Sequence, residues 1–228
     1  RKLCNHWTNG VFRGSLIEIN IKQIPTGKWK ENCYIISNSI GDALIIDPGD
    51  DKQKIEKYLD SNDFNVSAIL NTHAHYDHIG AVQYLKEKFN VPFFLGSADE
   101  TLLKTANLYI KLFDGSGLIK IPSVDYFYDQ YNVQDAIDSF RVEVIFTPGH
   151  TQGSVCLLID GCLFTGDILL NEKIGRTDLP GGNEQVLNES LKIISKMPSH
   201  INIYPGHGSS STIGYELKNN SSFIQALQ

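Results

Sequence analysis

The chain has 228 residues, 41% of them hydrophobic, which is typical of one large or two small soluble globular domains. Its net charge of −6 and the lack of any basic run in the sequence argue against nucleic acid as a partner. No apolar stretch approaches the roughly 20 residues of a membrane span, and the sequence starts with no signal peptide, so we expect no membrane partner.

The first half of the chain alternates short apolar strands with helices. Ile17, Ile19 and Ile21 alternate with polar residues, which predicts a half-buried strand. Apolar runs predict strands at 33–37, 43–46, 66–70 and 91–95, and helical spacing predicts helices at 51–59, 79–89 and 98–112.

The second half repeats this organisation after residues 115–138, which show no regular pattern and predict a long irregular insert. Strands are predicted at 141–146, 155–159, 162–164 and 201–204, and helices at 184–197 and after Thr212. Strands in two sets with helices following predict an α/β fold with two sheets and outer helices. We expect a single domain over residues 1–228, with residues 1–14 flexible or derived from cloning.

The four cysteines show no Cys-x-x-Cys spacing. Cys33, Cys156 and Cys162 lie in apolar strand-like runs, while Cys4 lies near the N-terminus. We therefore expect buried free thiols in a reducing, cytoplasmic compartment.

Residues 71–80 concentrate metal-ligand side chains on a predicted strand-to-helix turn. His73, His75, Asp77 and His78 fall within six positions, and imidazole and carboxylate groups are ligands that zinc favours. Such adjacent residues cannot all reach one ion. We expect His73 and His75 to share a first metal and the other two to face a second. The alternative is a polar turn whose histidines cap a helix.

Three further candidate ligands each follow an apolar strand in a turn that contains Gly or Pro. They are His150, Asp167 and His207. Strand ends at one sheet edge bring such side chains together, so we predict a two-metal site in which Asp167 bridges the ions. The predicted first ion is held by His73, His75 and His150, and the second by Asp77, His78 and His207. A hydroxide shared by the two metals would be the nucleophile, with Asp77 and Asp167 as the catalytic carboxylates. His6 and His200 are expected at the surface.

The motifs resemble those of the metallo-β-lactamase superfamily, in that family's order. They read Thr-His-Ala-His-Tyr-Asp-His-Ile-Gly, Pro-Gly-His-Thr, Thr-Gly-Asp and Pro-Gly-His-Gly. The resemblance implies a four-layer αββα sandwich and supports the seven ligands position by position. It implies two divalent ions, zinc first, with iron or manganese as alternatives.

Within the superfamily the chain resembles the short, bacterial-type glyoxalase II-like hydrolases. Residues 174–182 (Ile-Gly-Arg-Thr-Asp-Leu-Pro-Gly-Gly) and 211–216 (Ser-Thr-Ile-Gly-Tyr-Glu) match two of their segments, although Asn220-Ser221-Ser222-Phe223 stands where Asn-Pro-Phe is usual. Asp167 occupies a position at which zinc β-lactamases place a cysteine, which argues against antibiotic hydrolysis.

The resemblance implies hydrolysis of an acyl thioester, carried by a small molecule or a carrier protein. The thiol could be glutathione, coenzyme A or an acyl carrier, as in polyketide biosynthesis. Ser209 replaces a family tyrosine, and no counterpart of the larger enzymes' C-terminal glutathione-binding domain is expected. Arg176 either contacts a glutathione carboxylate or pairs with Asp178. Tyr109 and Phe113 are expected in the substrate wall, and most of the other aromatics of the insert in the core.

Two alternative activities use the same motifs. Persulfide dioxygenases hold one iron, which here would be bound by His73, His150 and Asp167, but they usually have Ala where this chain has Gly206. Gly206 therefore favours the two-metal hydrolase. A lactonase acting on a cyclic ester is the second alternative.

Overall fold

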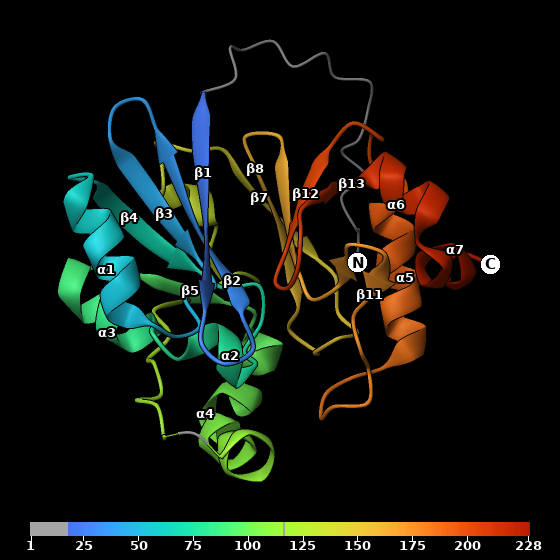
Figure 1. Cartoon of the computed structure of the whole chain (residues 1–228), viewed down its shortest axis with the longest axis horizontal. Helices are drawn as coiled ribbons and strands as arrows, with labels where there is room; N and C mark the ends of the chain where they lie inside the picture. The colour runs from blue at the N-terminus through green and yellow to red at the C-terminus, as the bar shows by residue number, and fades with distance from the viewer. Residues whose placement is uncertain (1–17, 116) are drawn as a thin grey trace.

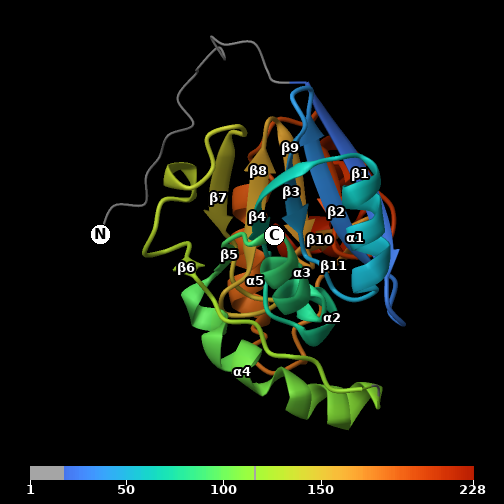
Figure 2. The same cartoon turned by 90° about the vertical axis from the view of Figure 1, so that its left-hand side faces the viewer.

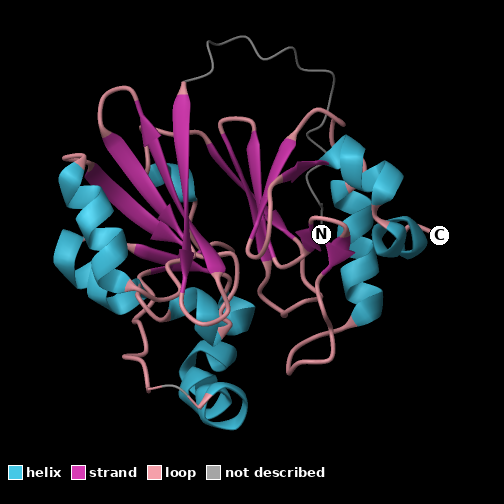
Figure 3. Ribbon diagram, in the orientation of Figure 1, coloured by secondary structure: helices cyan, strands magenta, loops and turns pink. Residues whose placement is uncertain are grey.

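A computed structural model describes residues 18–115 and 117–228, in which two β-sheets lie face to face between two layers of helices (Figure 1, Figure 3). Residues 1–14, which we predicted to be flexible or derived from cloning, lie outside the described residues, as do Cys4, His6 and Ile17. The predicted four-layer αββα sandwich is confirmed.

The first sheet contains six strands in the order β1-β2-β3-β4-β5-β6. Strands β1 to β3 pair antiparallel, and β3 to β6 pair parallel. Their bounds are β1 Ile19–Thr26, β2 Glu31–Asn38, β3 Asp42–Ile46, β4 Asn65–Leu70, β5 Phe93–Leu95 and β6 Tyr126–Phe127.

The second sheet contains five strands in the order β13-β12-β9-β8-β7. Strand β12 pairs parallel with β9, and the other pairs are antiparallel. The bounds are β7 Val142–Phe146, β8 Val155–Ile159, β9 Cys162–Gly166, β12 Asn202–Pro205 and β13 Ser211–Thr212, and a separate hairpin joins β10 Leu169–Leu170 to β11 Lys173–Ile174.

Helices cover the outer face of each sheet (Figure 1). Helices α1 (Lys52–Ser61) and α3 (Val82–Phe89) pack on the first sheet, and α5 (Glu184–Ile194), α6 (Ile213–Asn219) and α7 (Ser221–Ala226) pack on the second. The short α2 (Tyr76–Ile79) lies at one end of the sandwich, near α4 (Glu100–Tyr109) in Figures 1 and 2. The 3-10 helix η1 (Ser97–Asp99) precedes α4, and the π-helix η2 (Ile110–Asp114) follows it.

Alternation along the strands divides the apolar side chains between three cores. In β2, Cys33 and Ile35 pack toward α1 and α3, whereas Tyr34 and Ile36 pack between the sheets. Both faces of this strand are buried, which explains its nearly continuous apolar sequence. A third core lies between the second sheet and α5 to α7.

The predicted helix 79–89 is wrong as one element, because the chain forms α2 and α3 with a break at Gly80 and Ala81. The loop after β3 packs against this break: a Cβ on Gly80 would lie 2.3 Å from the carbonyl oxygen of Gly49, and Ala81 N donates to the carbonyl oxygen of Pro48. The apolar residues of the sequence therefore keep helical spacing across a point at which the packed loop interrupts the helix.

Other elements and side chains differ in detail from what the sequence predicts. The helix predicted at 98–112 is divided into η1, α4 and η2, and the insert at 115–138 contains β6 and η3 (Val133–Asp135) within otherwise irregular chain. Cys33 and Cys156 are buried free thiols, but Cys162 is only half-buried. The insert aromatics Tyr126, Tyr128 and Tyr131 pack in the core between the sheets, as expected.

Candidate metal centre

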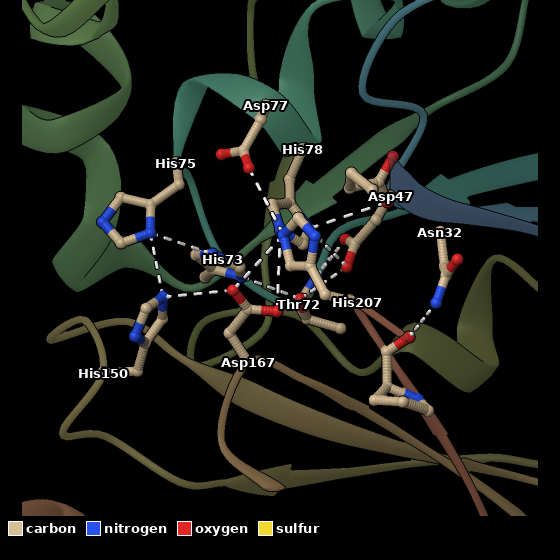
Figure 4. A network of polar contacts seen from close by, with 12 residues as sticks. Asn32, Asp47, Thr72, His73, His75, Asp77, His78, His150, Asp167 and His207 are labelled. Atoms are coloured by element: carbon tan, nitrogen blue, oxygen red, sulfur yellow. Dashed lines mark hydrogen bonds and ion pairs between the residues drawn. The ribbon is translucent and has the colours of Figure 1, made fainter. Parts of the chain in front are cut away.

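The seven predicted ligands come together on the loops at one end of the sandwich (Figure 4). His73 and His75 follow β4, Asp77 and His78 lie on α2, and the other three follow β7, β9 and β12; these are His150, Asp167 and His207. The strand ends thus supply every ligand position except the two on α2. His200, by contrast, is exposed, as predicted.

Three buried histidines form a first cluster, which we call the first trio: His73, His75 and His150. His75 Nδ1 lies 3.1 Å from His73 Nε2 and 2.9 Å from His150 Nε2. One ligand atom from each residue lies within 4.8 Å of the others. Three imidazole nitrogens facing one point are the geometry that a catalytic zinc or iron uses.

A second cluster, the second trio, combines Asp77, His78 and His207. Their ligand atoms also lie within 4.8 Å of one another, and Asp77 Oδ2 lies 3.3 Å from His207 Nε2. His78 is fully buried, while the other two side chains are partly exposed. The second trio therefore lies on the solvent side of the centre.

The Asp167 carboxylate lies between the two trios. Its Oδ2 is 3.7 Å from His150 Nε2 and 3.6 Å from His207 Nε2, and its Oδ1 is 3.8 Å from His78 Nε2 (Figure 4). One carboxylate thus faces both clusters, as a bridging ligand must.

The residues fit a bound cation. His78 Nε2 and Asp167 Oδ1 are buried and have no hydrogen-bond partner within the described chain. Buried polar atoms are nearly always satisfied, so atoms of this kind that converge on one point indicate a ligand that supplies positive charge.

Contacts at Nδ1, the ring nitrogen that faces away from the centre, orient three of the imidazoles. His78 Nδ1 lies 3.1 Å from Asp47 Oδ2, His73 Nδ1 lies 3.0 Å from Thr72 Oγ1, and His150 Nδ1 lies 2.8 Å from the carbonyl oxygen of Arg176. Acceptors at Nδ1 favour the tautomer that leaves Nε2 as a lone pair facing the centre.

The two trios differ in their affinity for protons. Burial and the neighbouring imidazoles hold the pKa of His73 well below its usual range, and burial lowers the pKa of His75 to about 3. Burial also opposes the charge of His78 and His207, but nearby carboxylates raise the pKa of both. Although burial opposes its ionisation, contacts with His207 and His78 hold the pKa of Asp77 well below its usual value. His73 and His75 are therefore neutral and ready to bind a metal at neutral pH.

Two buried carboxylates, Asp47 and Asp99, form hydrogen bonds that hold these loops in place. Neither was predicted from the sequence. Asp47 accepts from the backbone N–H of Thr72 at 2.7 Å and from its hydroxyl at 2.6 Å. Asp99 accepts from Ala74 N at 2.9 Å, Thr151 Oγ1 at 2.8 Å and Gly153 N at 2.7 Å. Asp99 thus ties the loop of His73 and His75 to the loop of His150. The only sequence pattern at Asp47 is the turn Asp47-Pro48-Gly49, and no pattern in the sequence marks Asp99.

The predicted substrate residues have differing surroundings. Arg176 is exposed and forms a two-bond ion pair with Asp178, Nε to Oδ1 and Nη2 to Oδ2, each at 2.7 Å. Tyr109 stacks on Phe113 with ring centroids 6.3 Å apart, and it lines a hollow of about 170 Å³ beside Asp99. Phe113 is 55% exposed and does not line this hollow.

The fold and the metal-ligand clusters identify the class of protein: the chain belongs to the metallo-β-lactamase superfamily, whose family model matches residues 26–207. It is similar to the probable metallo-hydrolase YqgX of Bacillus subtilis, at 34% identity over 82% of this chain and 89% of that one. It is also similar to the hydroxyacylglutathione hydrolase GloC of Haemophilus influenzae, at 33% identity over 89% of this chain and 97% of that one. The predicted glyoxalase II-like character is thereby supported.

Two solved structures are similar over nearly their whole length. BLEG-1, a B3 metallo-β-lactamase, has 34% identity and a TM-score of 0.82, covering 89% of this chain and 98% of that one. TTHA1623 in a di-iron-bound form has 32% identity and a TM-score of 0.78, covering 88% and 98%. These proteins share the fold, and the family depends on metal.

Across residues 18–115 and 117–228, none of the helices has the length and apolar character needed to cross a bilayer.

Proposed function

We propose that the protein is a metal-dependent hydrolase of acyl thioesters that holds two divalent ions. The observation that carries the proposal is the arrangement of two ligand trios on either side of the Asp167 carboxylate. The first ion would be held by the first trio and the second by the second trio, with Asp167 shared. The name of the di-iron-bound relative and that of the hydroxyacylglutathione hydrolase support the number of ions and the substrate class.

Imidazole and carboxylate ligands suit zinc first, with iron or manganese as alternatives. Bound ions at these positions would make water a nucleophile near neutral pH and would polarise the substrate carbonyl. Asp167 Oδ2 faces both trios, and we assign it and Asp77 the roles of orienting the attacking water and accepting its proton. The Nδ1 contacts of His73, His78 and His150 keep the imidazoles turned toward the reacting centre.

Thioester chemistry suits a site built in this way. A thiol has a pKa of about 8.5, so the leaving sulfur departs as a thiolate and needs no proton from a side chain. The carrier thiol is proposed to be glutathione, coenzyme A or an acyl carrier protein, the last as in polyketide biosynthesis. The ion pair with Asp178 favours a loop-fixing role for Arg176 over glutathione binding. The free thiols of Cys33, Cys156 and Cys162 support a reducing, cytoplasmic setting.

β-Lactam hydrolysis is the second candidate, because a metallo-β-lactamase is among the similar structures at 34% identity. Two other candidates share ligands with the proposal: a lactonase, and a persulfide dioxygenase with one iron on His73, His150 and Asp167. Both trios are complete, which favours a two-metal hydrolase over a one-iron oxygenase.

A comparative screen of the metal-loaded protein tests the proposal. The substrates are S-lactoylglutathione, acyl-N-acetylcysteamine and acyl-coenzyme A thioesters, an acyl-lactone, a β-lactam and glutathione persulfide with oxygen uptake as the readout. We expect thioesters to have the highest kcat/KM and the protein to contain two metal ions per chain. One iron per chain with oxygen uptake, or β-lactam turnover without thioester turnover, would refute it.

Two alanine variants provide a matched control. His75→Ala removes a nitrogen of the first trio and should lower metal content and abolish hydrolysis, while the circular dichroism spectrum stays that of the parent. His200→Ala removes an exposed histidine away from the centre and should change neither property. Full activity of His75→Ala with fewer than half the metals would contradict the ligand assignment.

A further inference from the structure

A hollow of about 490 Å³ lies directly beside the second trio and contains none of the other predicted ligands. Asp77 and its neighbour Tyr76, both on α2, form one side of it. The turn between β1 and β2, the N-terminal end of α1 and one side of α3 contribute other sides. Ile110, Asp114 and residues 117–120 complete the lining. A substrate held at the metal centre could therefore extend one arm into this hollow.

Two of the large apolar side chains that line the hollow are exposed to water. Trp29 is 48% exposed and Leu118 is 58% exposed, and the buried Ile110 and the half-buried Ile119 also line the hollow. Exposed apolar groups that gather beside an active centre indicate a surface that a ligand covers. Leu112 and Phe113 on η2 are exposed as well, but neither lines this hollow.

The two sides of the hollow are bonded to each other without a ligand. Trp29 Nε1 donates to Asp114 Oδ1 at 2.9 Å, and Lys28 Nζ lies 3.2 Å from the same oxygen. These contacts join the β1–β2 turn to the C-terminal end of η2. The hollow is therefore preformed, which reduces the loss of conformational freedom when a ligand binds.

The charges around the hollow disfavour an anionic ligand. Its lining contains five carboxylate side chains and three lysines. Lys28 pairs with Asp114, and Lys120 Nζ pairs with Glu87 at 2.6 Å, so two of the three cations are already neutralised by the protein. Apart from Asp77, which the second ion would hold, the lining has four carboxylates and three lysines, so phosphates and carboxylates would meet no excess of positive charge there.

We propose that this hollow binds the acyl group of the substrate and selects neutral, unbranched acyl chains of several carbons over lactoyl and over anionic acyl groups. Glutathione, coenzyme A and carrier-bound thiols all bear carboxylates or phosphates, so the acyl group is the arm of the thioester that suits an apolar, net acidic wall. The inference rests on the proposed thioesterase function and adds the substrate class.

Binding of thioethers, which cannot be hydrolysed, tests the inference separately from the reaction. S-Alkyl-N-acetylcysteamines with ethyl, butyl, hexyl and octyl chains are titrated into the full, metal-loaded chain by calorimetry. Transfer of each methylene into the hollow should tighten binding about fourfold until the hollow is filled. A carboxyl-terminated chain of hexyl length should bind at least about tenfold more weakly than hexyl.

Two variants separate a local effect from a general one. Leu118→Asn should weaken octyl binding about fivefold and leave ethyl binding within about twofold of the parent. Ile40→Asn also replaces an exposed aliphatic side chain, 80% exposed, but lies in the β2–β3 turn at the far end of the strands, and it should keep the parent's chain-length dependence.

Affinities that do not rise with chain length, or a rise that Leu118→Asn leaves intact, would overturn the inference. The same length dependence should appear in kcat/KM for acetyl to octanoyl thioesters on one thiol. If the thioethers bind as expected but no thioester is hydrolysed, the proposed function fails while the apolar hollow stands.

Discussion

Replacing Gly206 by alanine should remove the second metal ion and leave the first. Gly206 directly precedes His207, and a Cβ at this position would lie 2.3 Å from Asp167 Oδ1 and 2.7 Å from His78 Cε1. The backbone cannot withdraw easily, because Gly206 N donates to the carbonyl oxygen of Gly166 at 2.8 Å and Asn32 N donates to the carbonyl oxygen of Gly206 at 2.7 Å.

The size of the effect follows from these distances. Ordinary contacts of a Cβ begin at 3.4 Å, so Asp167 or the backbone must move by about 1 Å. Metal sites tolerate errors of about 0.2 Å in ligand distance, so this displacement should weaken binding of the second ion by at least about 100-fold. The cost in folding free energy should be about 1–3 kcal/mol, as for an overpacked core, and the protein should still fold.

Metal content per chain after dialysis is the assay, measured by plasma mass spectrometry alongside thermal unfolding. We expect about one ion per chain in Gly206→Ala and two in the parent, with thioester hydrolysis reduced at least about 100-fold. Gly117→Ala is the control for metal content, because no atom lies within 4 Å of a Cβ at that position. Retention of two ions by folded Gly206→Ala would refute the reasoning.

Three further predictions concern the pH dependence of metal binding, the hydrogen bonds of Asp99 and the role of Arg176. Burial lowers the pKa of His75, whereas the pKa of His207 is raised, because Asp77 and Asp167 outweigh its burial. His207 must therefore release a proton to bind metal at a pH at which His75 is already neutral. Acidification from about pH 8 to about pH 6 should remove the second ion before the first, and equal loss of both ions in a chelator titration would contradict this. Asp99→Ala removes three buried hydrogen bonds and should lower the free energy of unfolding by about 2–4 kcal/mol in urea titrations, whereas a loss below about 1 kcal/mol would show that these hydrogen bonds are dispensable. Arg176→Ala should leave KM for S-lactoylglutathione within about threefold, since the guanidinium is bonded to Asp178, and a tenfold rise would show that it contacts the substrate.

The sequence predicted the layers of the fold because its apolar patterns are local. The continuous run in β2 and the periodic α5 each indicate their own burial. The turns after the strands bring five of the seven ligand candidates to one edge, and α2 adds Asp77 and His78. The break between α2 and α3 was not predictable in this way, since it depends on the approach of Gly49, which lies far away in the chain.

The role of Asp99 and the residues that line the large hollow were harder to predict, because both depend on contacts between distant parts of the chain. Asp99 resembles any polar residue before a helix, and only its contacts with Thr151 and Gly153 reveal its role. Trp29 lines the large hollow because the β1–β2 turn packs against η2, a contact between residues 85 positions apart. Long-range contacts of this kind leave no periodic signal.

Each trio takes two ligands from the first half of the chain and one from the second: His150 completes the first trio and His207 the second. A bound ion in either trio is therefore a cross-link between the two sheets, in addition to the apolar core between them. Metal removal should loosen the docking of the sheets more than it affects either sheet alone. If the chain were cut in the insert between β6 and β7, the two fragments would be expected to reassociate more tightly with metal than without it.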